Sequence, residues 1–309
     1  MTYRVVHTTR YRYSQPVTLC HNEAHLRPRS FGRQRCVDSR LSIEPAPAQR
    51  HERTDCFGNP VTYFAVQEPH DTLVVTATST VELAPATPPD FDASQPWDTL
   101  AQRLARSISP GVLEARHLVL DSPMVISSPD LAAFAQRSLG AGRPLLAAVH
   151  DLSQQIHREF VYDPHFSTIA TPLSEVLTLR RGVCQDFAHL AIGCLRSLGV
   201  PARYVSGYLQ SVPPPGQPRL VGADTSHAWF AVFDPDTGWV AFDPTNDQIV
   251  GEQHVTTAWG RDYSDVTPLK GVIFGGGAHT LEVAVDMEGE EVISDPVTSD
   301  QNQPVTSNQ

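Results

Sequence analysis

The chain has 309 residues, of which 40% are hydrophobic, and a formal net charge of −11 at pH 7. This length favours two domains with well-formed cores, and every apolar run is too short to span a bilayer. Arginines and tyrosines occupy the N-terminus where a signal peptide carries an apolar stretch. Five cysteines without C-x-x-C spacing imply neither a disulfide framework nor a zinc site. We therefore expect a cytoplasmic protein with no cofactor, metal or membrane partner.

The first 85 residues are expected to form a small antiparallel β-domain. β-Branched and aromatic residues recur there in short, often alternating runs, separated by turn signals such as Ser14-Gln15-Pro16. These runs are 3–7, 9–13, 40–43, 61–66 and 73–83. Residues 1–53 hold ten arginines against four acids, but the arginines are dispersed and accompany no nucleic-acid motif. We expect no nucleic-acid partner.

A proline-rich linker at 86–96 is expected to lead into a second domain, residues 97–293. The second domain has helical patterns first and strand patterns afterwards, an order that indicates an α+β fold. The helices are expected at 97–106, 128–138 and 145–159, and the strands at 202–209, 228–233, 239–242, 283–285 and near 292. The polar and acidic residues 294–309 are expected to be a disordered tail.

The segment 180–190, RRGVCQDFAHL, places a cysteine at the start of an amphipathic helix. Apolar residues follow at helical spacing, and a glycine and a proline at 199–201 end the pattern. Cys184 therefore lies in the first turn, where unpaired N–H groups and the positive pole of the helix stabilise a thiolate. Most buried cysteines are inert small hydrophobes, and Cys194 is expected to be one. The position of Cys184 is that of a nucleophile.

A histidine and an aspartate downstream are placed to act with Cys184. His227 opens a predicted strand, and after a turn at 234–238 the chain returns in a second strand that ends at Asp243. Such a hairpin sets the two side chains opposite each other or one diagonal apart, within reach of a hydrogen bond. Each alone has a plain explanation as a surface histidine or a strand-end acid. Together they predict a triad of nucleophile, base and orienting acid.

Several segments resemble the transglutaminase-like cysteine superfamily. Its three-part core motif corresponds to 182–187, 226–229 and 239–245, and the segments 162–164 and 199–208 fit the same core. The segments 7–13, 26–29 and 55–59 resemble the β-domain that precedes this core in a bacterial group of such proteins. The resemblance implies a papain-like fold, in which a cysteine-bearing helix packs on an antiparallel sheet that carries the histidine and the acid.

The same resemblance implies Cys184 as nucleophile, His227 as general base and acid, and Asp243 as the orienting group. The expected reaction is acyl transfer from a peptide or protein amide through a thioester, in which water gives hydrolysis and a primary amine gives transglutamination. We expect hydrolysis of a peptide or isopeptide bond. Amine transfer, glutamine deamidation and a non-catalytic protein-binding scaffold stay open. So do the oligomeric state, the role of residues 1–85 and the oxyanion donor, for which the Cys184 N–H is a physical candidate.

Overall fold

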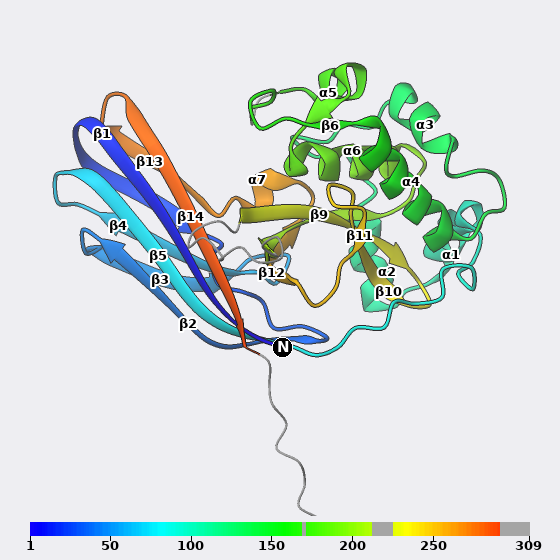
Figure 1. The fold of residues 1–309 in the computed structure, drawn as a ribbon, viewed down its shortest axis with the longest axis horizontal. Helices are drawn as coiled ribbons and strands as arrows, with labels where there is room; N and C mark the ends of the chain where they lie inside the picture. The colour runs from blue at the N-terminus through cyan, green and yellow to red at the C-terminus, as the bar shows by residue number, and fades with distance from the viewer. Residues whose placement is uncertain (169–170, 212–224, 291–309) are drawn as a thin grey trace, which may run out of the picture.

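The computed structural model describes residues 1–168, 171–211 and 225–290, which form an α+β fold (Figure 1). A long twisted β-sheet lies on one side of the molecule, and a smaller sheet with its helices lies on the other. The fold class predicted from the sequence is confirmed. Within the described ranges, no helix has the length and apolar character needed to cross a bilayer.

The larger sheet is built around one long strand, β1 (Thr2–Ala24), whose first residues are alternately buried and less buried. Residues 2–12 of β1 lie between β5 and β14, and residues 20–24 lie between β4 and β13, all antiparallel. The other strands of this sheet in the described residues are β2 (Gln34–Glu44), β3 (Gln49–Thr54), β4 (Pro60–Val66), β5 (His70–Leu83), β13 (Leu269–Gly275) and β14 (His279–Glu290).

The turn predicted at residues 14–16 is wrong, because β1 continues through this segment. The N–H groups of Ser14 and Gln15 donate to carbonyls in the connection between β13 and β14. Pro16 has no N–H to donate and lies where the pairing with β5 is irregular. Residues 14–16 have the local sequence of a turn, but hydrogen bonds to the connection between β13 and β14 keep them extended.

The end of the described chain returns to the N-terminal sheet, where β13 and β14 pair with β1. This corrects the predicted second domain, residues 97–293, because 269–290 join the first sheet. The pairing satisfies an edge of β1 that would otherwise expose unpaired backbone groups. It joins residues as distant in sequence as Thr2 and Glu290, so no local pattern reveals it. The expected strand near 292 and the expected tail, 294–309, lie outside the described residues.

The smaller sheet is antiparallel, with the strand order β11-β10-β9-β8-β12. Its strands are β8 (Ala202–Leu209), β9 (Thr225–Asp234), β10 (Gly238–Asp243), β11 (Gln248–Ile249) and β12 (His254–Gly260). A separate parallel pair joins β6 (Val161–Tyr162) to β7 (Arg181–Gly182). Of these strands, β8, β9 and β10 match predicted ones, whereas β12 has no counterpart among them.

Helices cover one face of the smaller sheet (Figure 1). They are η1 (Trp97–Thr99), α1 (Leu100–Arg106), α2 (Pro110–His117), α3 (Pro129–Gln136), α4 (Leu145–Glu159), α5 (Leu173–Leu179), α6 (Cys184–Ser197) and α7 (Tyr263–Val266). Ala228 and Phe230 of β9 join the core that contains α6. Trp229, between them, faces the opposite way, toward Phe31 and Phe57 of the N-terminal region. The smaller sheet is therefore buried on both faces.

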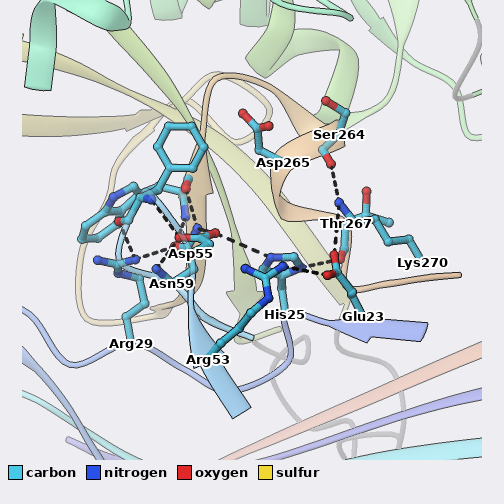
Figure 2. A network of polar contacts seen from close by, with 12 residues as sticks. Glu23, His25, Arg29, Arg53, Asp55, Asn59, Ser264, Asp265, Thr267 and Lys270 are labelled. Atoms are coloured by element: carbon cyan, nitrogen blue, oxygen red, sulfur yellow. Dashed lines mark hydrogen bonds and ion pairs between the residues drawn. The ribbon is translucent and has the colours of Figure 1, made fainter. Parts of the chain in front are cut away.

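A turn of the N-terminal region at residues 55–59 binds directly to β12 (Figure 2). Asp55 Oδ1 closes the turn by accepting hydrogen bonds from the N–H groups of Phe57 and Asn59. The fully buried Asn59 amide then donates to the Trp259 carbonyl at 2.8 Å and accepts from the Trp259 N–H at 3.0 Å. These bonds fix the N-terminal sheet against the sheet that carries the site.

Candidate active site

Cys184 is the first residue of α6, a 14-residue helix that packs on the smaller sheet. Val183 before it is extended, with φ −114° and ψ 180°. The Asp186 carboxylate accepts a hydrogen bond from the Val183 N–H at 2.8 Å and so caps the first turn. The Cys184 N–H belongs to the first turn, so it has no helical carbonyl to bind and is directed out of the helix end. The thiol is half-buried at this positive pole.

The segment just before Cys184 is held in place by the parallel pair of β6 and β7. The Asp163 N–H donates to the Gly182 carbonyl at 2.9 Å, and the Asp163 carboxylate lies 2.8 Å from the Arg181 guanidinium. A Cβ atom at Gly182 would lie 2.8 Å from atoms of the Asp186 side chain. Glycine at this position therefore leaves room for the carboxylate that caps the nucleophile's helix.

His227 and Asp243 lie on neighbouring strands of the hairpin formed by β9 and β10. Phe230 is paired with Phe242, so His227 and Asp243 are one diagonal apart, one of the two arrangements that the sequence predicts. His227 Nε2 lies 2.8 Å from Asp243 Oδ2. The two residues are 7% and 0% exposed, so water competes little for this hydrogen bond.

The Cys184 thiol lies near enough to the His227 imidazole to act on it through hydrogen bonding and charge, and both effects raise the pKa of His227. Because His227 Nε2 faces Asp243, the nitrogen directed toward the sulfur is Nδ1. Burial alone would lower the pKa of His227, but the hydrogen bonds and charges of Asp243 and Cys184 raise it to about 10. The geometry brings all three predicted residues together and keeps the imidazole protonated at neutral pH, the state that best accompanies a thiolate.

Asp243 sits at the centre of a shell of hydrogen-bond donors. Its Oδ2 atom also accepts from Asn246 Nδ2 at 2.7 Å, and its Oδ1 atom accepts from the backbone N–H of Thr245 at 3.0 Å. Burial raises the pKa of this carboxyl, but the bonds from His227, His254 and Asn246 hold it far below its usual range. Asp243 is therefore ionised, as a group that orients an imidazolium must be.

His254 is a second histidine that contacts Asp243, and no motif in the sequence points to it. Its Nε2 atom lies 3.3 Å from Asp243 Oδ2. The Gly251 N–H donates to His254 Nδ1 at 3.4 Å, so Nδ1 is an acceptor and the proton is on Nε2. Burial lowers the pKa of His254 in spite of Asp243, which raises it. His254 is therefore a neutral donor, unlike the charged His227.

Cys184 acts electrostatically on three tyrosines: Tyr162, Tyr204 and Tyr263. Burial is the first cause of the raised pKa of each phenol, and the nearby Cys184 raises it further. The three phenols therefore stay protonated at neutral pH. By contrast, Cys194 is fully buried in α6, and burial strongly raises the pKa of its thiol. This environment matches the inert role predicted for Cys194.

A cavity of about 620 Å³ opens beside the first turn of α6. Gln185, Asp186 and His189 of α6 line one side of it, and Met124 and Leu173 lie among its apolar lining. Gln185, the residue after Cys184, is the part of its lining next in sequence to the nucleophile. In the described ranges, no group of three or more histidine, cysteine, aspartate or glutamate side chains is arranged to hold a metal ion.

Comparison with known proteins agrees with the geometry. Residues 3–82 match the model of the bacterial transglutaminase-like N-terminal region, and residues 132–244 match that of the transglutaminase-like superfamily. An uncharacterized protein of Mycobacterium tuberculosis is 43% identical over 293 residues, which cover 92% of each chain. The chain belongs to the transglutaminase-like superfamily. The family resemblance drawn from the core motifs and from the N-terminal segments is thereby confirmed.

This transglutaminase-like protein is similar to two further proteins, one over its whole fold and one over about a third of its length. A Cytophaga hutchinsonii protein, described as a candidate cysteine protease, has a TM-score of 0.72 and 20% identity, covering 98% of this chain and 95% of that one. It shows the same fold, N-terminal sheet included. A protein-glutamine gamma-glutamyltransferase of Pseudomonas aeruginosa is 29% identical over 123 residues, which cover 34% of this chain and 18% of the relative.

Proposed function

We propose that the protein is a cysteine-dependent acyl-transfer enzyme that hydrolyses a peptide or isopeptide bond through a thioester. The observation that carries this proposal is the hydrogen bond of 2.8 Å between His227 and the buried Asp243, together with the action of the nearby Cys184 on the His227 imidazole. Nucleophilic acyl transfer needs three parts: a thiolate, which a helix end favours, a protonated imidazole, and an ionised acid that orients the imidazole.

In the first half-reaction, the Cys184 thiolate forms a bond to the carbonyl carbon of the substrate amide. The carbonyl electron pair moves to the oxygen, which the Cys184 N–H at the helix end is placed to bind. When the tetrahedral intermediate collapses, His227 gives its Nδ1 proton to the nitrogen, the carbon–nitrogen bond breaks and the amine leaves. The acyl group stays on sulfur as a thioester. Asp243 holds the imidazole in the orientation that this proton transfer requires.

In the second half-reaction, His227 takes a proton from water as the water oxygen attacks the thioester carbon. The carbon–sulfur bond breaks, a carboxylic acid leaves and the thiolate is restored next to the protonated His227. A primary amine in place of this water yields a new amide by the same steps. That second candidate function is favoured by the Pseudomonas aeruginosa relative, whose name describes glutamine-directed acyl transfer.

The acyl acceptor is tested with purified wild-type protein and a library of peptides and isopeptides in ¹⁸O-labelled water containing a fluorescent primary amine. We expect cleaved products whose new carboxyl groups carry ¹⁸O, and no product with Cys184→Ala. Ammonia release with amine incorporation and no cleavage would replace hydrolysis by transglutamination. Ammonia release with ¹⁸O in an uncleaved glutamine side chain would replace it by deamidation.

The scaffold alternative is tested in the same experiment. A protein-binding scaffold retains partner binding in Cys184→Ala and gives no cysteine-dependent product with any substrate. If wild type and Cys184→Ala yield identical product profiles while both remain folded, the enzymatic proposal is rejected. Circular dichroism of the two proteins establishes that the comparison is between folded chains.

A further inference from the structure

Two arginines and two tryptophans form a stack behind the triad, between the N-terminal region and the smaller sheet. The Arg203 guanidinium carbon lies 4.2 Å from the ring centre of Trp239 and 3.8 Å from that of Trp259. The Arg29 guanidinium carbon lies 3.5 Å from the Trp259 ring centre. Two guanidinium groups fit this close to one ring only on its opposite faces. The order of the stack is therefore Trp239, Arg203, Trp259 and Arg29.

Arg203 is a buried cation whose positive charge is only partly balanced by its surroundings. It is 6% exposed, and the only acid that acts on it through charge among the described residues, Glu114, forms no ion pair with it. Burial lowers the pKa of Arg203 to about 9, Glu114 opposes this and Arg29 adds to it. Arg203 remains charged at neutral pH. The faces of two tryptophans supply part of the missing stabilisation, but a buried charge also requires hydrogen-bond acceptors.

A cavity of about 120 Å³ lies against this stack. Three N–H donors of its lining residues are buried and have no hydrogen-bond partner among the described residues: Arg33 Nη1, Arg203 Nε and Trp259 Nε1. Arg33 is fixed by its other terminal nitrogen, Nη2, which donates to the Gly251 carbonyl at 2.6 Å. The three residues that carry these unpaired donors come from different parts of the chain and line one space, an arrangement that matches a bound acceptor.

The cavity lining contains donors and aromatic surface but no carboxylate. Gln34 also lines it, but its amide is occupied by the backbone of Thr256, to which it donates at 2.8 Å and from which it accepts at 2.8 Å. Glu252 acts on Arg33 through charge without lining the cavity. Two positive side chains therefore face a space that no acidic side chain of the described residues fills.

We propose that this cavity is a binding site for one small anion, a halide or a small carboxylate such as acetate, held by Arg33, Arg203 and Trp259. A water molecule could accept one of these hydrogen bonds, but it would not neutralise the guanidinium charges. One molecule occupies ~30 Å³ in liquid water, so the cavity has about four times that volume. A cavity of this size can hold a chloride ion together with water, or an acetate ion by itself. Sulfate carries twice the charge and serves as a size and charge comparison.

The bound anion joins two parts of the molecule and lies next to the triad. Arg33 belongs to the N-terminal region, whereas Arg203 and Trp259 belong to β8 and β12 of the smaller sheet. His254, which donates to Asp243, also lines the cavity. The anion therefore stabilises the docking of the N-terminal sheet against the sheet that carries Asp243 and His227. This inference stands on the cavity alone and does not depend on the proposed reaction.

The test measures the melting temperature and tryptophan fluorescence of the full chain at constant ionic strength. Sodium gluconate, whose anion is too large for the cavity, is replaced stepwise by chloride, by acetate or by sulfate. We expect a saturable rise in melting temperature with chloride or acetate, and the one that acts at lower concentration identifies the ligand. Bromide soaked into crystals should give an anomalous peak within hydrogen-bond distance of Arg203 Nε.

The matched variants are Arg33→Gln and Arg35→Gln. Arg33→Gln removes one charge and one donor from the cavity and should weaken anion binding at least about tenfold, since hydrogen bonds to charged groups are worth about 1.5–3 kcal/mol. Arg35, whose exposed side chain pairs with Glu82 at 2.7 Å, lies two residues away and should have no effect when changed. Equal melting temperatures in gluconate, chloride and acetate, or a bromide peak only at exposed arginines, would overturn the proposal. Equal affinity in Arg33→Gln and wild type would do so as well.

Discussion

His254 donates a hydrogen bond to Asp243 at 3.3 Å, although its strand is separated from that of Asp243 by two others in the sheet order. At this contact the start of β12 meets the end of β10. One carboxylate thus holds two histidines in different states. His227 has a raised pKa and is charged, whereas His254 has a lowered pKa and is neutral. We regard His254 as a positioning residue for Asp243.

Replacing His254 tests this positioning role. His254→Leu removes the donor to Asp243 Oδ2 but keeps the volume, whereas His254→Gln retains an N–H donor at a similar distance from the backbone. We expect His254→Leu to lower kcat about tenfold or more with little change in KM, because the orientation of the imidazole affects proton transfer and not substrate binding. His254→Gln should recover most of this loss. A parallel fall in both variants, tracking a fall in melting temperature, would assign His254 a purely structural role.

The raised pKa of His227 predicts the alkaline limit of activity. The folded pKa of about 10 exceeds the ordinary value of about 6.5, so the stabilisation from protonated His227 is complete below about pH 6.5 and is lost as the pH rises through about 10. The leaving amine needs the same proton, so kcat/KM should decline near pH 10. The measurement is a pH profile of kcat/KM beside urea unfolding over the same range.

Asp243→Asn should move that alkaline limit toward lower pH. The amide removes the negative charge and the hydrogen bond that raise the pKa of His227, so the imidazole loses its proton earlier. Activity at neutral pH should fall on the order of 10²- to 10⁴-fold, the range expected when a triad loses its acid. Nuclear magnetic resonance titration of His227 follows its protonation directly. An unchanged titration in Asp243→Asn would show that Asp243 does not control His227.

The sequence predicts those parts of the site that depend on neighbouring residues. The helical stripe after Cys184 places the thiol at the start of α6, and the short turn between two strands brings His227 within a diagonal of Asp243. The start of α3 is predicted for the same reason, since Ser128 caps the helix by accepting from the Leu131 N–H. In each case the partners are a few residues apart or joined by one hairpin.

The features missed in the sequence depend on contacts between distant segments. His254 reaches Asp243 from a strand that is not a neighbour of β10, and a single histidine in a polar stretch gives no sign of this. The return of residues 269–290 to β1 is hidden for a similar reason, since its pairing partners lie at the other end of the chain. Asn246 is close enough in sequence to Asp243 to be found, because an amide three residues after a strand-end acid can bind back to it.

The bonds between Asn59 and Trp259 predict a large stability effect at a site without catalytic residues. Asn59→Ala leaves the Trp259 N–H and carbonyl buried without their partners and also removes an acceptor of Arg29. We expect the free energy of unfolding to fall by about 2–4 kcal/mol. Urea denaturation measures it, with Gln67→Ala in an exposed turn as the control. If both substitutions cost less than about 0.5 kcal/mol, the junction at residues 55–59 does not stabilise the fold.

The difference between the two cysteines of α6 gives the most direct check on the nucleophile. Cys184 is half-buried at the helix end near a protonated imidazole, whereas Cys194 is buried inside the core. Iodoacetamide reacts with thiolates, so from about pH 5 to about pH 9 Cys184 should be alkylated at least about tenfold faster than Cys194. The ratio of the alkylation rate of Cys184 to that of the exposed Cys56 should be largest at low pH. His227→Ala should remove the faster alkylation of Cys184 at low pH and leave the alkylation rate of Cys56 unchanged.

Tryptic mass spectrometry of timed samples resolves the three sites. Equal rates for Cys184 and Cys56 at about pH 5 would refute an activated thiolate, and a rate that survives His227→Ala would attribute the activation to the helix end instead of the imidazole.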